Sequence, residues 1–110
     1  MAYSEPLAQR IRRLLKRRKN FVEKKMFGGV GFTLSGNLCC AIWKDSLILR
    51  VGPDLYEDTL AEPHVRVFDI TGRPMTGWVM VAPDGFPDDE SLRNWLDLAY
   101  HFCRTLPPKS

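Results

Sequence analysis

The sequence contains no long apolar run. None of its stretches approaches the roughly 20 apolar residues that a membrane span needs. The basic N-terminal end is not followed by the apolar segment of a secretory signal. Hydrophobic residues make up 45% of the 110 residues and charged residues 26%, which is typical of a globular domain and argues against disorder. We therefore expect one soluble domain located in the cytoplasm, with no membrane partner.

Cysteines are few, and none of them has a metal-binding or redox spacing. Cys39 and Cys40 are adjacent, and neighbouring residues of a strand point to opposite faces, so one bridge or one metal is not expected to use both. We interpret these two and Cys103 as small buried hydrophobic residues in a reducing compartment. We expect no metal site and no cofactor.

Residue patterns that carry catalysis are missing. The chain has no nucleophile elbow, no phosphate-binding P-loop and no zinc-protease motif. The glycines of segment 28–31 are not followed by a helix pattern, so they predict a sharp turn or bulge instead of a phosphate cradle. His64 is expected at the surface, and His101 lies about 200° around a helix from Cys103, too far to share a ligand. We expect no enzyme activity and no catalytic residue.

Positive charge is concentrated at the N-terminal end. Residues 1–25 contain nine Lys and Arg against two acidic residues, a net charge of +7, whereas residues 26–110 contain seven against eleven, a net charge of −4. A helix is predicted over Ser4–Arg18, because its apolar residues recur at helical spacing. Its opposite side is either the solvated face of a packed helix or a patch that binds nucleic acid, although no base-reading motif accompanies it. That possible nucleic-acid patch consists of Arg12, Arg13, Lys16, Arg17 and Lys19.

The rest of the chain predicts an antiparallel sheet. Short gaps rich in Gly, Asn and Asp separate the first four strands, which is typical of hairpins. An apolar helix stripe near the C-terminus, which includes Trp95, is expected to be buried against this sheet. The predicted class is α+β, with a single antiparallel sheet of five to six strands and N-terminal and C-terminal helices. We expect strands at 21–27, 30–34, 38–43, 46–51, 65–68 and 78–81, an ordered loop at 69–77, and further helices at 53–61 and 88–105.

The third and fourth strands are apolar on both faces, which predicts cover on both sides. The final helix and the short one are expected on one face, and the other face is left mainly to the first helix, whose apolar stripe is too small for it. We therefore predict a homodimer that buries the remaining apolar area. The alternative is that the loop at 69–76 folds over this face. We expect Leu38, Ile42 and Ile48 on one face and Trp43 and Leu49 on the other.

Four segments carry a resemblance to a known family. They are KKMFGGVGF, SGNLCCAIWKDSLILRVGP, FDITGRPMTGWVMV and FCRTLPPK, and the match spans about residues 6–109 in this order. Together they resemble the TfoX N-terminal domain family, which takes its name from a bacterial competence regulator. The resemblance implies an α+β fold like that of the secretion chaperones, which are commonly dimers. It also implies a role in transcription regulation through a partner activator protein.

We accordingly expect residues 1–110 to form a single TfoX N-terminal-like domain standing alone. It would be a small regulatory binding domain without chemistry of its own, acting through protein contacts. The family motifs supply a candidate interaction surface of Lys24, Lys25, Arg73 and Trp78, and we expect the three cations to be exposed on one side of the molecule. The motifs are alternatively determinants of the fold. Nucleic-acid binding by the first helix and a small-ligand or enzyme site around Arg73 are the other functions considered.

Overall fold

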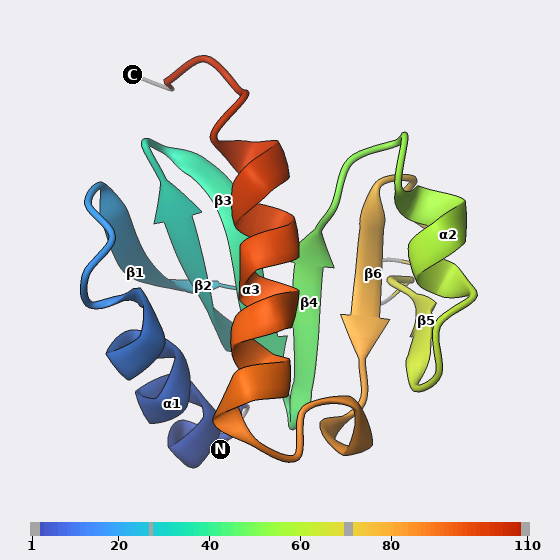
Figure 1. The fold of residues 1–110 in the computed structure, drawn as a ribbon, viewed down its shortest axis with the longest axis horizontal. Helices are drawn as coiled ribbons and strands as arrows, with labels where there is room; N and C mark the ends of the chain where they lie inside the picture. Colours follow the sequence, from blue (N-terminus) through green and yellow to red (C-terminus); the bar gives the residue numbers. More distant parts are fainter. Residues whose placement is uncertain (1–2, 27, 70–71, 109–110) are drawn as a thin grey trace.

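The computed structural model describes residues 3–26, 28–69 and 72–108. It confirms the predicted α+β class: a six-stranded sheet in which neighbouring strands are antiparallel, in the order β1-β2-β3-β4-β6-β5 (Figure 1). No helix in the described part of the chain is long and apolar enough to cross a membrane. The elements are α1 (Glu5–Leu15), β1 (Phe21–Met26), β2 (Gly29–Leu34), β3 (Asn37–Trp43), β4 (Ser46–Arg50), α2 (Tyr56–Leu60), β5 (Val65–Val67), β6 (Trp78–Val81), the 3-10 helix η1 (Pro83–Gly85) and α3 (Asp89–Cys103).

Both long helices begin at a side-chain cap. Ser4 accepts the backbone N–H of Leu7 at 3.3 Å, and Asp88 accepts that of Ser91 at 2.8 Å, which satisfies amides that the first turn leaves without partners. The first helix ends at Leu15, three residues earlier than predicted. Its C-terminal turns lead to Asn20, whose positive φ of 71° reverses the chain into β1.

The two long helices lie on the same face of the sheet (Figure 1). Leu7 and Ile11 of α1 and Leu92 and Leu96 of α3 join Leu49 of β4 in one main core. The expectation that the first helix covers the opposite face is therefore wrong. The short apolar stripe of α1 does not have to cover a whole face of the sheet, because α1 and α3 cover one face together.

The opposite side, which we call the helix-free face, holds a second buried cluster. Ala41, Ile48, Phe68 and Met80 form it, and Trp78 packs against it from the first position of β6, as Trp43 does from the last position of β3. Phe68 stands at the start of the long loop that joins β5 to β6. The chain itself thus covers part of the apolar face that the sequence left open.

A bulge in β3 changes which side chains share a face. Phe32 pairs with Cys40 and Thr33 pairs with Leu38, which leaves Cys39 as the extra residue between them. Cys39 and Cys40 are consequently both buried in the main core, and the prediction that they point to opposite faces is wrong. The prediction that all three cysteines are buried is confirmed.

The predicted distribution of strand residues between the faces is also wrong. Ile42 pairs with Leu47 in the main core, whereas Ile48 pairs with Ala41 on the helix-free face. Trp43 and Leu49 are divided in the same way, since Leu49 belongs to the main core. Leu38 precedes the bulge, so its spacing from Ile42 does not place both on one face.

Trp95 is only half-buried, whereas the sequence predicted full burial against the sheet. Its indole Nε1 donates a hydrogen bond to the carbonyl oxygen of Gly85 at 2.8 Å, which fixes it against η1. Its other neighbours line a hollow of about 460 Å³ between α3 and the short helix α2. Trp95 itself lines this hollow, which agrees with its partial exposure.

Candidate functional site

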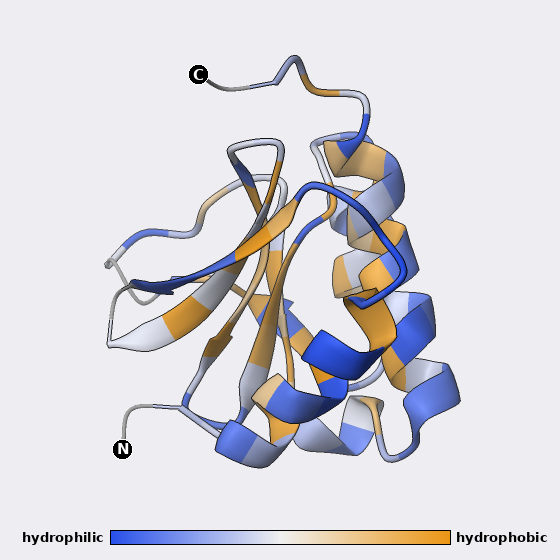
Figure 2. Cartoon of the chain, turned by 90° about the vertical axis from the view of Figure 1, so that its left-hand side faces the viewer, coloured by the Kyte–Doolittle hydropathy of each residue, from blue (hydrophilic) through white to orange (hydrophobic). Residues whose placement is uncertain are grey.

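Two segments project from the side of the sheet that carries no helix (Figure 2). One is the β1–β2 hairpin with the motif KKMFGG, and the other is the β5–β6 loop with the motif GRPM followed by Gly77 and Trp78. Lys24, Lys25 and Arg73 are exposed. Phe27, Ile70 and Thr71, which the sequence places in this strand and loop, lie outside the described residues. Lys24 and Lys25 are neighbours in β1, so their side chains point to opposite sides of the strand, and a common surface of both lysines with Arg73 stays a prediction.

Successive side chains of β1 point to alternate sides of the sheet, so only some of them lie on the helix-free face. Phe21 packs against the ring of Tyr100 on α3, and Glu23 binds Arg12 on α1. Val22 and Lys24 therefore point to the other side of the strand. Val22 is 52% exposed, which is unusual for a β-branched residue in a strand with one buried face.

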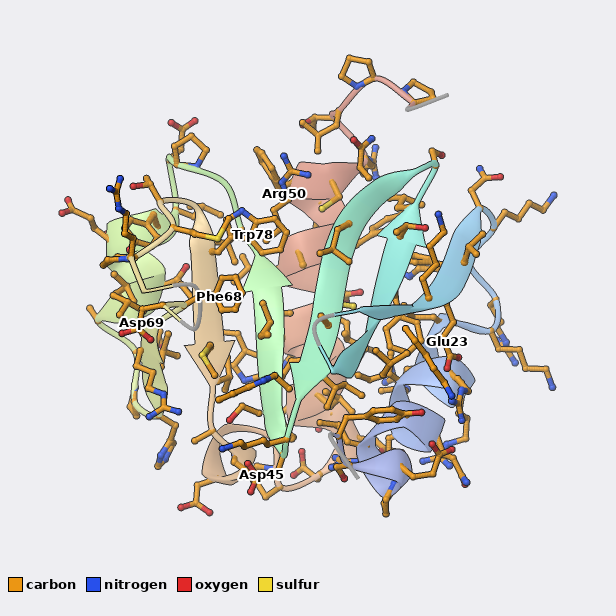
Figure 3. The ribbon with its side chains drawn as sticks, turned by 180° about the vertical axis from the view of Figure 1, so that it is seen from behind. Glu23, Asp45, Arg50, Phe68, Asp69 and Trp78 are labelled. Carbon is orange, nitrogen blue, oxygen red and sulfur yellow. The ribbon has the colours of Figure 1, made fainter. Side chains whose placement is uncertain are left out.

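An aromatic and cationic group lies over β4 and β6 on the helix-free face. Arg50, Trp78 and Phe68 lie in a row over β4 and β6 (Figure 3). The guanidinium carbon of Arg50 is 5.3 Å from the ring centroid of Trp78, and the rings of Phe68 and Trp78 are 6.0 Å apart at an angle of 41°. Further along the face, the ammonium nitrogen of Lys44 is 4.6 Å from the ring of Trp43. Both tryptophans remain half-exposed, so each offers an apolar surface with a cation beside it.

Backbone hydrogen bonds hold the β5–β6 loop in shape. The N–H of Met75 donates to the carbonyl oxygen of Phe68 at 3.1 Å, and that of Trp78 donates to Met75 at 3.0 Å. Phe68 is buried in the second cluster and anchors the loop at its start. Arg73 and Met75 are consequently presented on an ordered segment, with Met75 37% exposed.

Two glycines of the family motifs determine the fold. The carbonyl oxygen of Gly77 accepts the N–H groups of Val51 at 2.8 Å and Gly52 at 3.1 Å, which ties the start of β6 to the end of β4. Gly52 and Gly77 both have positive φ, at 87° and 91°. A Cβ at Gly52 would lie 2.4 Å from Cδ1 of Phe102. The motifs therefore combine fold-determining glycines with exposed cations.

The five residues of the predicted nucleic-acid patch on and after the first helix differ in whether they form ion pairs within the chain. Arg12 is bound by Glu23 and Glu5, and Arg13 is bound by Asp89 at 2.9 Å. The hydrogen bonds of Arg12 lower the pKa of Glu5, and those of Arg13 and Arg10 lower the pKa of Asp89. The carboxylates of the same chain therefore occupy two of the five patch residues. Lys16, Arg17 and Lys19 are exposed and have no ion pair within residues 3–26, 28–69 and 72–108.

The structure does not assemble a metal site from the residues it describes: no group of three or more His, Cys, Asp or Glu side chains is suitably placed. His64 and His101 are both exposed, one before β5 and one on α3. The hydrogen bond with Cys39, followed by burial, raises the pKa of the Cys103 thiol. Such a thiol is a poor nucleophile and a poor metal ligand at neutral pH.

Sequence reasoning identified Lys24, Arg73 and Trp78 of this face. It missed Val22, Trp43, Lys44, Arg50 and Phe68. The alternation of each strand could have placed Val22 beside Lys24 on one face, because the core-facing Phe21 gives the phase. Phe68 and Arg50 join the site through the pairing of β4, β5 and β6, which no local pattern reveals.

Comparison with protein families gives one match. The model of the TfoX N-terminal domain matches residues 13–103 of the 110. A search of curated proteins finds no match. The matched range includes β1 to β6, all of α3 and only the last three residues of α1, and it contains both motifs that border the helix-free face. The chain therefore belongs to the TfoX N-terminal domain family.

Proposed function

We propose that this chain is a cytoplasmic regulatory binding domain that acts through protein contacts in transcription regulation and performs no chemistry of its own. The observation that carries the proposal is the composition of the helix-free face. Two half-exposed tryptophans lie there, and Val22 and Met75, two of the exposed large hydrophobic residues, border it on the hairpin and the loop. Tryptophan and arginine are the residues most enriched at the energetic centres of protein interfaces.

The charge of this face favours an acidic partner. Arg66 pairs with Met80, whose side chain is buried on the helix-free face, so Arg66 joins the cations of that face. Cations outnumber carboxylates among its described residues, and opposite charges at an interface rim steer association and fix the orientation of the partner. A protein with an apolar patch bordered by Asp and Glu fits best. Strand alternation, the contact with Trp43, strand register and the β5–β6 loop assign Lys24, Lys44, Arg66 and Arg73 to this face. Figure 3 shows Arg50 and the carboxylates Asp45 and Asp69 on it.

The homodimer predicted from the sequence would use the helix-free face as its interface, so that face could not also bind the proposed partner. In a symmetric pair, the cationic borders of both copies would come close to one another, and like charges repel. Phe68 and its cluster have also removed part of the apolar area that motivated the dimer. Light scattering tests the competition directly: a mass near 12.6 kDa supports a free face, and about twice that mass supports the dimer.

The proposal is tested with a tagged copy of the full chain in its native host. Proteins that co-purify are identified by mass spectrometry, produced separately, and titrated against the purified chain. We expect an acidic partner whose affinity falls at least about tenfold for Arg73→Glu or Trp78→Ala. The matched control is Arg93→Glu, an exposed arginine on the helix side that makes the same change of charge. Equal losses for Arg73→Glu and Arg93→Glu contradict the proposal, because a specific contact requires the helix-free face.

Nucleic-acid binding by the first helix is the second candidate function. It has less support, since Arg12 and Arg13 are bound to carboxylates of the same chain. A small-ligand site around Arg73 has less support still, because Gly72 beside it has open space around it and the loop residues there are exposed.

A further inference from the structure

The basic residues near the end of α1 fall into two groups. Arg18, like the arginines earlier in α1, has a carboxylate partner: it binds Asp97 of α3. Arg17 and Lys19 on either side of it are exposed and have no ion pair among the described residues. Intramolecular pairing therefore explains Arg18 and leaves the charges of Arg17 and Lys19 unexplained.

These two cations line a pocket of about 550 Å³. Three segments meet there: the turn after α1, the β2–β3 turn, and the end of α3 with the residues that follow it. A third exposed cation, Arg104, lines it from the α3 side, and none of the described residues that line it is acidic. Ligand pockets commonly have volumes of about 300–1,000 Å³.

Side chains that contact one another form one wall of the pocket. The guanidinium carbon of Arg18 lies 3.9 Å from the ring centroid of Tyr100, while Asp97 binds the same guanidinium. The guanidinium carbon of Arg104 lies 6.0 Å from the same ring. Tyr100 thus lies beside cations from both helix ends.

Like charges that converge on one concave site repel one another, and an anion in the site relieves this repulsion. The dipole at each helix C-terminus favours a cation there, but this effect acts on each helix separately and does not create a shared pocket. Guanidinium groups bind phosphate oxygens with two parallel hydrogen bonds, and ammonium groups add a point charge. Asn20 and Ser35 provide polar groups at the pocket, and Leu34, Leu106 and Pro108 provide apolar contact.

We propose that this pocket binds a compact polyphosphate ligand of nucleotide size, with Arg17, Lys19 and Arg104 contacting the phosphates. The apolar residues at the pocket accommodate the organic part of the ligand. The pocket is separate from the helix-free face, so this proposal does not depend on the proposed protein contact. Its position, between the end of α1 and the end of α3, would let the ligand bridge the two helices.

The test is calorimetric titration of the full chain with ATP and with inorganic triphosphate. We expect saturable binding with one site per chain, weakened at least about tenfold by Arg17→Ala with Arg104→Ala, since each change removes charge-assisted hydrogen bonds. The control is Arg73→Ala with Arg93→Ala, which removes the same charge from exposed positions outside the pocket. Circular dichroism establishes that both variants fold.

Three outcomes would overturn the proposal. The first is that the parent binds neither probe. The second is an equal loss in both double variants, which would show non-specific attraction to net positive charge. The third is that duplex or single-stranded DNA binds the parent more tightly than ATP and depends equally on Arg17 and Arg104, which would assign these cations to a nucleic-acid backbone.

Discussion

Arg12 of α1 donates two hydrogen bonds to the carboxylate of Glu23 in β1, from Nε to Oε1 at 2.6 Å and from Nη2 to Oε2 at 2.6 Å. The same guanidinium reaches Glu5 at 2.8 Å through Nη1, so one arginine connects the first turn of the helix to the edge strand. The hydrogen bonds from both carboxylates raise the pKa of Arg12. Part of the basic cluster that the sequence offers as a binding patch thus serves to attach α1 to the sheet.

Replacement of this arginine tests its structural role. We expect Arg12→Ala to lower the free energy of unfolding by about 1–2 kcal/mol, because the bidentate ion pair with Glu23 is lost and the carboxylates of Glu23 and Glu5 lose this arginine as a partner. Urea unfolding measures the change. Arg93→Ala, an exposed arginine of α3 without an ion pair in the described chain, should stay within about 0.5 kcal/mol of the parent. A loss no larger than that of this control would mean that the pair contributes nothing to folding.

The ion pairs also predict how stability changes with pH. The pKa of Glu5 is held below its ordinary 4.5 and that of Asp89 below its ordinary 3.8, by hydrogen bonds from Arg12 and from Arg13 with Arg10. A carboxyl whose pKa is lower in the folded state stabilises the fold above its unfolded pKa, and this stability is lost as the pH falls through the folded value. We expect the urea midpoint to fall as the pH drops below these ordinary values.

The double variant Arg10→Ala with Arg13→Ala provides the comparison for the acid range. It leaves Asp89 without its two cations, so this carboxyl titrates nearer its ordinary value in the folded state. The variant should be less stable than the parent at neutral pH, and the difference should shrink in acid. A difference that stays constant between neutral and acidic pH would show that these arginines act through contacts that do not titrate, such as the hydrogen bond from Arg10 to the carbonyl oxygen of Phe86 at 3.1 Å, and not through Asp89.

Glycine at position 52 is required for two reasons that can be measured separately. Gly52 has a φ of 87°, and a Cβ there would lie 2.4 Å from the ring of Phe102. We expect Gly52→Ala to destabilise the fold by about 2–4 kcal/mol, the sum of a left-handed backbone cost and overpacking. Gly72→Ala is the matched control, because Gly72 has a φ of 94° and nothing within 4 Å. Its cost should be only about 1–2 kcal/mol, and equal costs for both variants would refute the crowding at Phe102.

Local patterns in the sequence predicted the helices and strands. They did not predict how segments that are distant in the sequence pair and pack. Turn residues placed the hairpins, and helical spacing placed α1 and α3, because both signals lie within a few residues of one another. The bulge at Cys39 depends on how β3 pairs with Phe32 and Thr33 of the neighbouring strand. An apolar stripe shows which side of a helix is buried but not which face of the sheet receives it.

The candidate site shows the same division. Lys24 and Arg73 were found because they lie in family motifs, and their exposure follows from their charge. The row formed by Arg50, Trp78 and Phe68 arises because β6 lies between β4 and β5, although these three strands are separated in sequence by a helix and a long loop. Such a strand order is decided by packing of the whole sheet, so local spacing contains no signal for it.

The buried thiols give a last test of the core. Cys103 lies with its Sγ 3.9 Å from the carbonyl oxygen of Arg50 and 4.0 Å from that of Leu38, at the contact between α3 and the bulged strand. A hydrogen bond from Cys103 lowers the pKa of Cys39, but its hydrogen bond with Cys40 and burial outweigh this and raise that pKa overall. Since the thiolate is the reactive form, both groups should resist modification in the folded protein.

We therefore expect all three cysteines of the native chain to react with a thiol reagent such as dithionitrobenzoate only as fast as the protein opens. In denaturant, the three should react at the rate of free thiols. The labelling rate of the native chain should follow its stability, so the destabilised Gly52→Ala variant should label faster at the same pH. Rapid labelling of the folded parent, unchanged in Gly52→Ala, would place the cysteines outside the core and overturn the bulged strand that brings Cys39 and Cys40 onto one face.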